Sequence, residues 1–482
     1  MSKLSWRKSA SAVALLCVAT AIASPAQTST TLANFNYTNG DNPYTMSLVQ
    51  GTDGNLYGIT EFGGANGLGT VFKVTPTGAL TTLYSFCAKT NCTDGAVPFG
   101  GLVLGTDGNF YGTTSEGGET AEPCGAEGGI GDCGTVFKIT PAAKLTTLHS
   151  FDSTHGYTPG YGPLVQAANG NFYGTTTSGG AYGWGAVFSV TSGGAFTLLH
   201  SFDYTDGSGP NALIQAANGN LYGTTAAGGT GAGGDGTVIS ITSGGALTTL
   251  HSFGGADGNG PFAALVQAGN GNFYGTTTEG GANNLCNEEI YPGCGEVFEV
   301  TPAGKLTIVH SFDNSDGYYP VAPLIQATNG NLYGTITYGG AHGDGTVFEI
   351  TPTGTLTTLY SFDYPGGVEP LGGLVQATNG TFYGTTTGGG ANNYGTIFSL
   401  NLGLGPFVET LPTSGKVGAA VTILGTDLTG ATSVTFDGTA AVFKVVSSSE
   451  ITTNVPTGAT TGEVQVVTPS GTVSSNVSFR VP

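Results

Sequence analysis

The chain has 482 residues, of which 85 are glycine, 10% are aromatic and only 9% are charged, and its formal net charge is −20. Its aromatic content and mean hydropathy of +0.09 exclude a disordered low-complexity chain, which lacks the apolar residues that offset ordering entropy. The acidic balance repels phosphate backbones and anionic membranes, so we expect no nucleic-acid partner. Abundant glycine beside β-branched and aromatic residues predicts an all-β fold of short strands and tight turns.

Residues 1–26 have the pattern of a secretory signal peptide. Lys3, Arg7 and Lys8 precede an apolar stretch at residues 10–23, and small residues suited to cleavage follow it. This stretch is too short for a stable membrane anchor, and no later apolar run is long enough to cross a bilayer. We therefore expect an exported protein, either secreted, periplasmic or at the cell surface, with no transmembrane segment after cleavage.

An internal repeat dominates the next part of the chain. The phrase Leu/Phe-Tyr-Gly occurs seven times at intervals of 49 to 62 residues. A representative unit, residues 323–362, reads as four strands, with an Asn-Gly turn between the first pair and a Thr-Pro-Xaa-Gly turn between the last pair. Four antiparallel strands repeated radially predict a seven-bladed β-propeller over residues 27–402. A leucine-rich solenoid is the alternative, but its repeat is shorter.

The two ends of the repeat region are offset in a circular way. The seventh repeat stops after its third strand, at residues 395–400, and a stretch matching the missing fourth strand lies at residues 30–35. This offset predicts that the N-terminal strand completes the last blade and closes the ring, which removes exposed sheet edges.

The repeated pattern LYGTT…GG…GTVF…TPxGxLTTLYSF resembles the GloVer tandem repeat of exported bacterial proteins in the choice-of-anchor family, over residues 29–402. The resemblance implies export and implies no activity. This chain departs from that family at its end, where Val481-Pro482 follows neither a hydrophobic nor a basic tail. Residues 403–482 resemble an IPT/TIG immunoglobulin-like domain with short alternating strands. Some such domains bind DNA, but this one lacks a basic face.

Six cysteines after the signal peptide fall into three close pairs in loop segments, which favours local disulfides in an oxidising compartment. Zinc is the alternative, but it would need four converging ligands. The predicted pairs are Cys87 with Cys92, Cys124 with Cys133, and Cys286 with Cys294.

The loops that join second to third strands, and each fourth strand to the next first strand, are expected on one face, which we call the loop face. Acidic and aromatic residues gather in these loops, and rigidly held long loops often carry function. Aromatic rings stack on sugars while carboxylates and amides bond hydroxyls, so we predict a glycan or extracellular protein as ligand. The alternative is that these residues only solubilise the face. The predicted ligand-binding residues are Tyr182, Trp184, Tyr204, Tyr291, Tyr318, Tyr319, Tyr338 and Tyr394.

Two loops resemble fragments of calcium loops but lack the later glutamate of an EF-hand, so calcium is the one cofactor considered. The carboxylates concerned are Asp203, Asp206, Asp313 and Asp316. Recurring histidines (His149, His200, His251 and His310) and recurring glutamines are interpreted as parts of the repeat, the glutamines as bonds between blades.

No catalytic motif stands out, and no catalytic residue is assigned. Glu279 with Glu288 or Glu289 could form a carboxylate pair for glycoside cleavage, but so many loop acids make such a pair by chance. A binding or adhesion protein is therefore the predicted function. A polysaccharide hydrolase or lyase and a structural envelope component are the alternatives.

Overall fold

The computed structural model describes residues 29–44, 47–119, 133–282, 286 and 293–482, and shows an all-β chain. One short 3-10 turn, η1 (Thr90–Cys92), interrupts the strands, although the sequence predicts no helical segment. Within these described ranges, no helix is long and apolar enough to span a membrane.

Residues 29–400 form seven sheets in their described parts, numbered here in chain order. The first contains β2 (Val49–Gln50), β3 (Leu56–Thr60), β4 (Thr70–Val74) and β5 (Leu80–Ser85). The second contains β6 (Ala96–Leu104), β7 (Phe110–Glu116), β8 (Thr135–Ile139) and β9 (Leu145–Ser150). The third contains β10 (Tyr157–Pro159), β11 (Val165–Gln166), β12 (Phe172–Ser178), β13 (Ala186–Val190) and β14 (Phe196–Ser201). The fourth contains β15 (Ser208–Gln215), β16 (Leu221–Ala227), β17 (Thr237–Ile241) and β18 (Leu247–Ser252).

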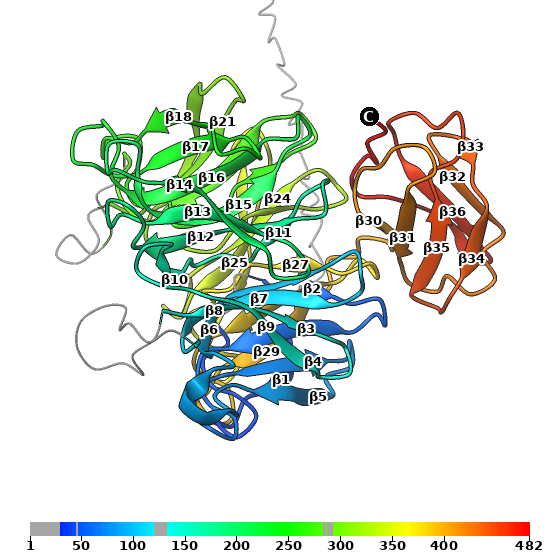
Figure 1. Cartoon of the computed structure of the whole chain (residues 1–482), viewed down its shortest axis with the longest axis horizontal. Coiled ribbons are helices and arrows are strands. Elements are labelled where there is room, and N and C mark those ends of the chain that lie inside the picture. The colour runs from blue at the N-terminus through cyan, green and yellow to red at the C-terminus, as the bar shows by residue number, and fades with distance from the viewer. Residues whose placement is uncertain (1–28, 45–46, 120–132, 283–285, 287–292) are drawn as a thin grey trace, which may run out of the picture.

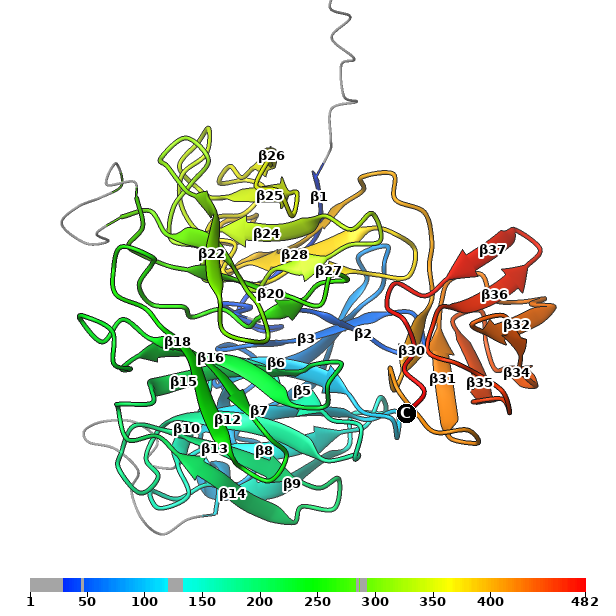
Figure 2. The ribbon, with the colours of Figure 1, turned by 90° about the horizontal axis from the view of Figure 1, so that it is seen from above.

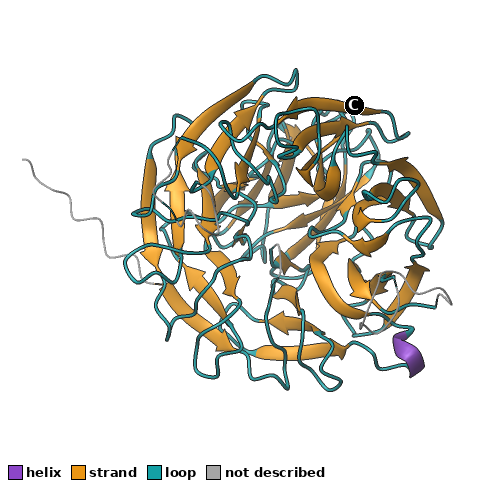
Figure 3. Ribbon diagram, turned by 90° about the vertical axis from the view of Figure 1, so that its left-hand side faces the viewer, coloured by secondary structure: helices purple, strands orange, loops and turns teal. Residues whose placement is uncertain are grey.

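The fifth sheet contains β19 (Val266–Gln267), β20 (Phe273–Thr277), β21 (Glu296–Val300) and β22 (Leu306–Ser311). The sixth contains β23 (Ile325–Gln326), β24 (Leu332–Ile336), β25 (Thr346–Ile350) and β26 (Leu356–Ser361). The seventh contains β27 (Val375–Gln376), β28 (Phe382–Thr386), β29 (Thr396–Leu400) and the N-terminal strand β1 (Ser29–Asn34). Figure 3 shows these sheets side by side around a common centre.

The first strand of most sheets is shorter than the sequence predicts, with only two residues in β2, β11, β19, β23 and β27. Each is preceded by a proline that cannot donate to the ladder, such as Pro43 before β2. The longer β6 and β15 keep their pairing across the proline only through a register shift.

The predicted pairing of the N-terminal strand is present. Strand β1 pairs antiparallel with β29, with Thr30 opposite Ser399. Phe35, which follows β1, is fully buried and packs edge-on against Phe72 of the first sheet, with ring centroids 5.2 Å apart. Its hydrophobic cluster also includes Ile397 of the seventh sheet. The first and last sheets are therefore packed together around this N-terminal segment.

The Tyr-Gly phrase is explained by packing between neighbouring sheets. Tyr57 stacks on Phe110 of the second sheet, with centroids 4.1 Å apart, and Tyr111 stacks likewise on Phe172. A side chain in place of Gly58 would meet Phe72 at 2.6 Å. The phrase is thus scaffold, because it provides a flat contact to the next sheet and room for a ring behind it.

The recurring glutamines bond neighbouring sheets, as predicted. The Oε1 atom of Gln326 accepts from the Gly269 N–H at 2.8 Å, and Gln267 does the same for Ala217 at 2.9 Å. The last and first sheets are joined in this way through Gln50 and the Thr378 N–H at 2.9 Å.

The recurring histidines lie in four different sheets and most pair with an aspartate. The Nε2 atoms of His200, His251 and His310 each lie 2.7 Å from an Asp carboxylate six residues later. His149 differs, because His155 stands at that position and bonds Asp152 instead. Burial and then the neighbouring His155 lower the pKa of His149 to about 4, with Asp152 opposing.

Replacing His155 with aspartate is expected to give His149 the partner that its counterparts have. The unfolded histidine takes up a proton below about pH 6.5 while the folded one does not, so stability falls as pH drops from 6.5 toward 4. In His155→Asp we expect about 1–2 kcal/mol less loss at pH 5. Urea unfolding at pH 5 and 8 measures this, and His155→Ala is the control. An unchanged pH slope in His155→Asp would contradict the assignment.

A separate β-sandwich follows the repeats and lies on one side of them (Figures 1 and 2). Its first sheet contains β30 (Glu409–Leu411), β31 (Ala420–Leu424), β35 (Glu450–Asn454) and β34 (Phe443–Val445). Its second sheet contains β33 (Thr439–Ala440), β32 (Ser433–Phe436), β36 (Val464–Thr468) and β37 (Gly471–Ser474). The two sheets enclose one apolar core that includes Ile423, Phe436 and Val466.

The sandwich contacts the face that carries the Asn-Gly and Asp-Gly turns, which we call the turn face. Ser449 Oγ donates to the Thr52 carbonyl at 2.6 Å, and the Phe407 N–H donates to the Thr378 carbonyl at 3.0 Å. Leu424 packs into a cluster with Leu104, which stands where other repeats have the bonding glutamine. The sandwich therefore docks where the repeat pattern is broken.

Candidate ligand-binding face

Disulfide bonds cross-link loops in the described part of the loop face. Cys87 is bonded to Cys92, and Cys286 to Cys294. Cys133 is also disulfide-bonded, while Cys124, its predicted partner, lies outside the described residues. Two of the three predicted pairings are thus present. They limit the conformational freedom of the loops that carry them.

Aromatic pairs stand at two junctions between sheets on this face, and all their members are exposed except Tyr394, which is half-buried. Trp184 and Tyr204 lie with ring centroids 4.8 Å apart, between the third and fourth sheets. Tyr394 and Tyr37 lie 5.7 Å apart, between the seventh and first sheets. The members of the two pairs occupy equivalent positions in their repeats. We call them the rim pairs. Tyr37 is not among the residues that the sequence predicts for ligand binding.

The backbone at two of these tyrosines is strained. Tyr37 has a φ of 63° and Tyr204 a φ of 74°, while the equivalent residue between the fourth and fifth sheets is Gly255, with a φ of 75°. A side chain in this left-handed region costs about 1–2 kcal/mol, which glycine avoids. Strain of this kind gathers at functional sites, so the rings themselves warrant a functional hypothesis.

The remaining predicted aromatics are less uniform. Tyr318 lies near Tyr338, with centroids 5.5 Å apart, and Tyr319 lies 6.1 Å from Tyr338, all within the sixth sheet's loops. Tyr182 is 64% exposed. Tyr291 lies outside the described residues. Several of the predicted aromatics that the structure describes therefore stand in separate neighbouring pairs.

The aspartates considered for calcium bond the donors of their own loops. Asp203 Oδ1 accepts from the Thr205 hydroxyl at 2.6 Å, and Asp206 binds His200. Asp313 and Asp316 repeat this arrangement with Ser315 and His310. The hydroxyl bonds lower the pKa of Asp203 and of Asp313. The described residues contain no cluster of three or more His, Cys, Asp or Glu suited to a metal. Calcium binding stays a prediction.

The carboxylate pair considered for catalysis is only partly described, because Glu288 and Glu289 lie outside the described residues. The carboxylate of Glu279 accepts from the Asn259 amide at 3.3 Å. Burial and then the neighbouring Asp235 raise the pKa of Glu279. This geometry assigns no catalytic role.

A second aromatic group, which the sequence prediction does not include, lies where several sheets converge. Tyr44 stacks on Phe99, with ring centroids 4.5 Å apart, Phe99 meets Tyr161 edge-on at 5.1 Å, and Tyr161 lies 6.4 Å from Phe262. These four residues come from the first, second, third and fifth sheets, and each follows or nearly follows the proline that precedes the innermost strand. These four sheets therefore approach one another at these residues. We call them the axial cluster.

A carboxylate adjoins the axial cluster. Glu61, after β3, accepts from the Asn42 amide at 2.6 Å. Burial, and then the carboxylates of Asp41 and Glu116, raise the pKa of Glu61 to about 7. Burial, with the nearby phenols of Tyr161 and Tyr319 and the Glu61 carboxylate, raises the pKa of Tyr44 above its ordinary value.

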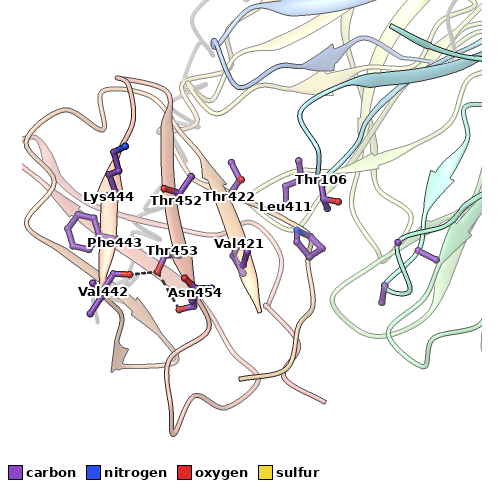
Figure 4. A pocket seen from close by; sticks show the side chains of 15 residues that line it. Thr106, Leu411, Val421, Thr422, Val442, Phe443, Lys444, Thr452, Thr453 and Asn454 are labelled. Carbon is purple, nitrogen blue, oxygen red and sulfur yellow. Dashed lines mark hydrogen bonds between the residues drawn. The ribbon is translucent and has the colours of Figure 1, made fainter. Parts of the chain in front are cut away.

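A larger crevice lies on the opposite side, between the sandwich and the turn face (Figure 4). It has a volume of about 610 Å³ and lies between Thr106 of the repeats and strands β31, β34 and β35. Lys444, Thr422 and Thr452 stand in one row across these strands, and Val442 is 93% exposed. Threonine hydroxyls and a single cation give this crevice little that selects a ligand.

Repeated four-stranded sheets and a terminal sandwich define an all-β, propeller-like repeat protein with an immunoglobulin-like domain. The Gloeobacter/Verrucomicrobia repeat model matches residues 19–160, 124–287 and 231–441, and the IPT/TIG model matches residues 407–481. The chain belongs to the Gloeobacter/Verrucomicrobia repeat family and carries an IPT/TIG domain. The resemblance seen in the sequence is confirmed. No curated protein matches the chain.

Solved structures share the general fold at low identity. A fungal alcohol oxidase of the AA5 family, in complex with copper, is 13% identical with a TM-score of 0.48, covering 92% of this chain and 98% of the oxidase. PorZ, a surface component of the type-IX secretion system of Porphyromonas gingivalis, is 13% identical with a TM-score of 0.45, covering 92% of this chain and 59% of PorZ. Similarity at this level says nothing of activity.

Proposed function

We propose that this chain is an exported, closed seven-bladed propeller that binds a glycan through the rim pairs of its loop face. The observation that carries the proposal is the repetition of an aromatic pair with at least one exposed ring at two equivalent junctions. In each pair one tyrosine has a left-handed backbone conformation that glycine would adopt at lower cost. Exposed rings of this kind provide the flat apolar surface on which sugar rings stack. The carboxylates of the surrounding loops can accept hydrogen bonds from sugar hydroxyls.

Export and ring closure have their own support. Disulfides form and persist in oxidising compartments outside the cytosol, and two are described on the loop face. Pairing of β1 with β29, and packing of the first sheet on the seventh, support a closed ring of seven blades. The IPT/TIG domain occupies the turn face, which leaves the loop face as the free end of the ring.

A glycan array of neutral oligosaccharides, probed with the mature chain, tests the proposal. We expect binding that Trp184→Ala weakens about three- to tenfold, because one stacked ring contributes roughly 0.5–1.5 kcal/mol. Tyr364→Ala is the matched control, since Tyr364 is 54% exposed on the same face and lies outside both rim pairs. Repeating the array with a chelator tests the predicted calcium.

The alternatives give different results. Release of new reducing ends from a bound polysaccharide would indicate a hydrolase, and new unsaturated ends would indicate a lyase. Binding only to an extracellular protein would replace the glycan as ligand. Silence across the array, together with incorporation into an assembled envelope layer, would favour a structural component and overturn the proposal.

A further inference from the structure

The axial cluster borders a small cavity that is separate from the rim pairs, and we call it the axial pocket. Its volume is about 220 Å³, and its walls include Glu61, Phe99, Ser115, Glu116 and Tyr161. This is below the roughly 300 Å³ at which drug-sized ligand pockets begin, so the pocket suits one small ring or an alkyl group.

Glu61 is not required by the repeat. Five of the six equivalent positions hold serine or threonine, and the sixth holds Ala226. The Ser115 hydroxyl donates to the Val97 carbonyl at 2.9 Å, and the Thr177 hydroxyl donates to the Thr158 carbonyl at 3.1 Å. A small residue at this position therefore satisfies the fold. Glu61 takes the place of this small residue in the first repeat. The same repeat contributes Tyr44 to the axial cluster.

The negative charge at the pocket has no cationic partner in the described part of the chain. The ion pairs found there involve none of Asp41, Glu61 and Glu116. Burial and mutual repulsion raise the pKa of Glu61 to about 7, and burial raises that of Asp41. The Oδ1 atom of Asn42, on the amide that bonds Glu61, is buried without a described partner. A bound cation would relieve this repulsion.

The pocket wall also presents the surface that an organic cation prefers. The face of an aromatic ring carries negative charge density and attracts an ammonium group placed within about 6 Å of its centre. Phe99 and Tyr161 line the pocket, and Tyr44 stacks behind Phe99. Two carboxylates beside two rings would hold an ammonium by charge and by cation–π attraction together, whereas a hydrated metal ion gains nothing from the rings.

We propose that the axial pocket binds an organic ammonium ion, supplied either by a free amine or by the amino group of a glycan. This site is distinct from the rim pairs and does not depend on neutral-glycan binding there. Choline is the probe, because its charge is fixed at every pH, and 3,3-dimethylbutanol is its neutral isostere.

Calorimetric titration of the mature chain at pH 8 and low salt tests the proposal. We expect choline to bind at least about tenfold more tightly than the isostere, and Glu61→Thr to weaken choline about tenfold. Lowering the pH to 5.5 protonates Glu61, whose pKa burial and the neighbouring carboxylates raise to about 7, so choline affinity falls. Glucosamine oligomers compared with their N-acetylated forms show whether a glycan amine also enters.

A control variant distinguishes the effect of a pocket carboxylate on choline binding from the effect of a carboxylate elsewhere. Asp427→Asn removes one exposed carboxylate from the sandwich, where asparagine tolerates the left-handed φ of 56°, and should leave choline binding unchanged. Glu116→Gln is a second pocket variant if Glu61→Thr folds poorly by circular dichroism. Equal affinity for choline and its isostere, or unchanged choline binding in both pocket variants, would overturn the proposal whatever the rim pairs bind.

Discussion

Phe35→Ala is expected to lower the free energy of unfolding by about 3–5 kcal/mol, the cost of truncating a fully buried phenylalanine. Phe35 is 0% exposed, and its N–H donates to the Gly395 carbonyl at 3.0 Å. Its ring fills the space between the first sheet and the seventh, so the truncation opens a cavity where the two ends of the repeat region meet. Urea unfolding followed by far-ultraviolet circular dichroism measures the loss.

Phe362→Ala is the matched control for this prediction. Phe362 is the equivalent residue between the sixth and seventh sheets, is also 0% exposed, and packs on Phe398 with centroids 5.0 Å apart. In a closed ring the two truncations should cost similar amounts. A loss of less than about 1 kcal/mol in Phe35→Ala beside a full loss in Phe362→Ala would show that the ring does not depend on its N-terminal segment.

Glu409→Gln is expected to stabilise the protein by about 1–2 kcal/mol at pH 8 and not at pH 4, with solvent screening of the half-buried side chain taken into account. Glu409 lies in β30, beside a cavity of about 330 Å³ between the sandwich and the repeats that also includes Leu104 and Leu424. Burial raises its pKa to about 7, with an opposing contribution from Asn476.

The sign follows from proton uptake. Between pH 4.5 and 7 the folded protein keeps a proton that the unfolded chain has released, so the wild type loses stability as pH rises through this window. Glutamine does not titrate and avoids the loss. Urea unfolding of both proteins at pH 4, 6 and 8 measures the difference. Glu61 has the same effect on the pH dependence of stability in both proteins, so its contribution cancels in the difference between them. A difference that is constant with pH would contradict the assignment.

Much of the scaffold could be predicted because the residues that make its contacts recur at the same position in most repeats. The glutamine of the innermost strand and the histidine of the fourth strand recur in register, and residues that recur in this way serve contacts that every blade makes. The bonds of Gln326 to Gly269 and of His310 to Asp316 follow this rule. Likewise, residues 30–35 match a strand that the last repeat lacks, so their pairing with β29 could be expected from the pattern.

The axial cluster could not be predicted, for a physical reason. Tyr44, Phe99, Tyr161 and Phe262 are between about fifty and two hundred residues apart, and none has the same residue type at every equivalent position. Only the packing of several sheets around one centre brings them together. One signal was present in the sequence: Glu61 stands where other repeats have a small residue, threonine or serine in most of them. The docking of the sandwich has a similar signal in Leu104, which replaces a glutamine.

By itself, the sequence determined the all-β class, the repeat, the N-terminal strand that completes the last sheet, the IPT/TIG domain and two disulfide pairs, because each depends on local or periodic patterns. Only the tertiary structure decided which loop aromatics become pairs, which residues meet at the axis and which face the sandwich covers. Those contacts join residues that differ between repeats and lie far apart along the chain, and their proximity is set by how the sheets pack around one centre.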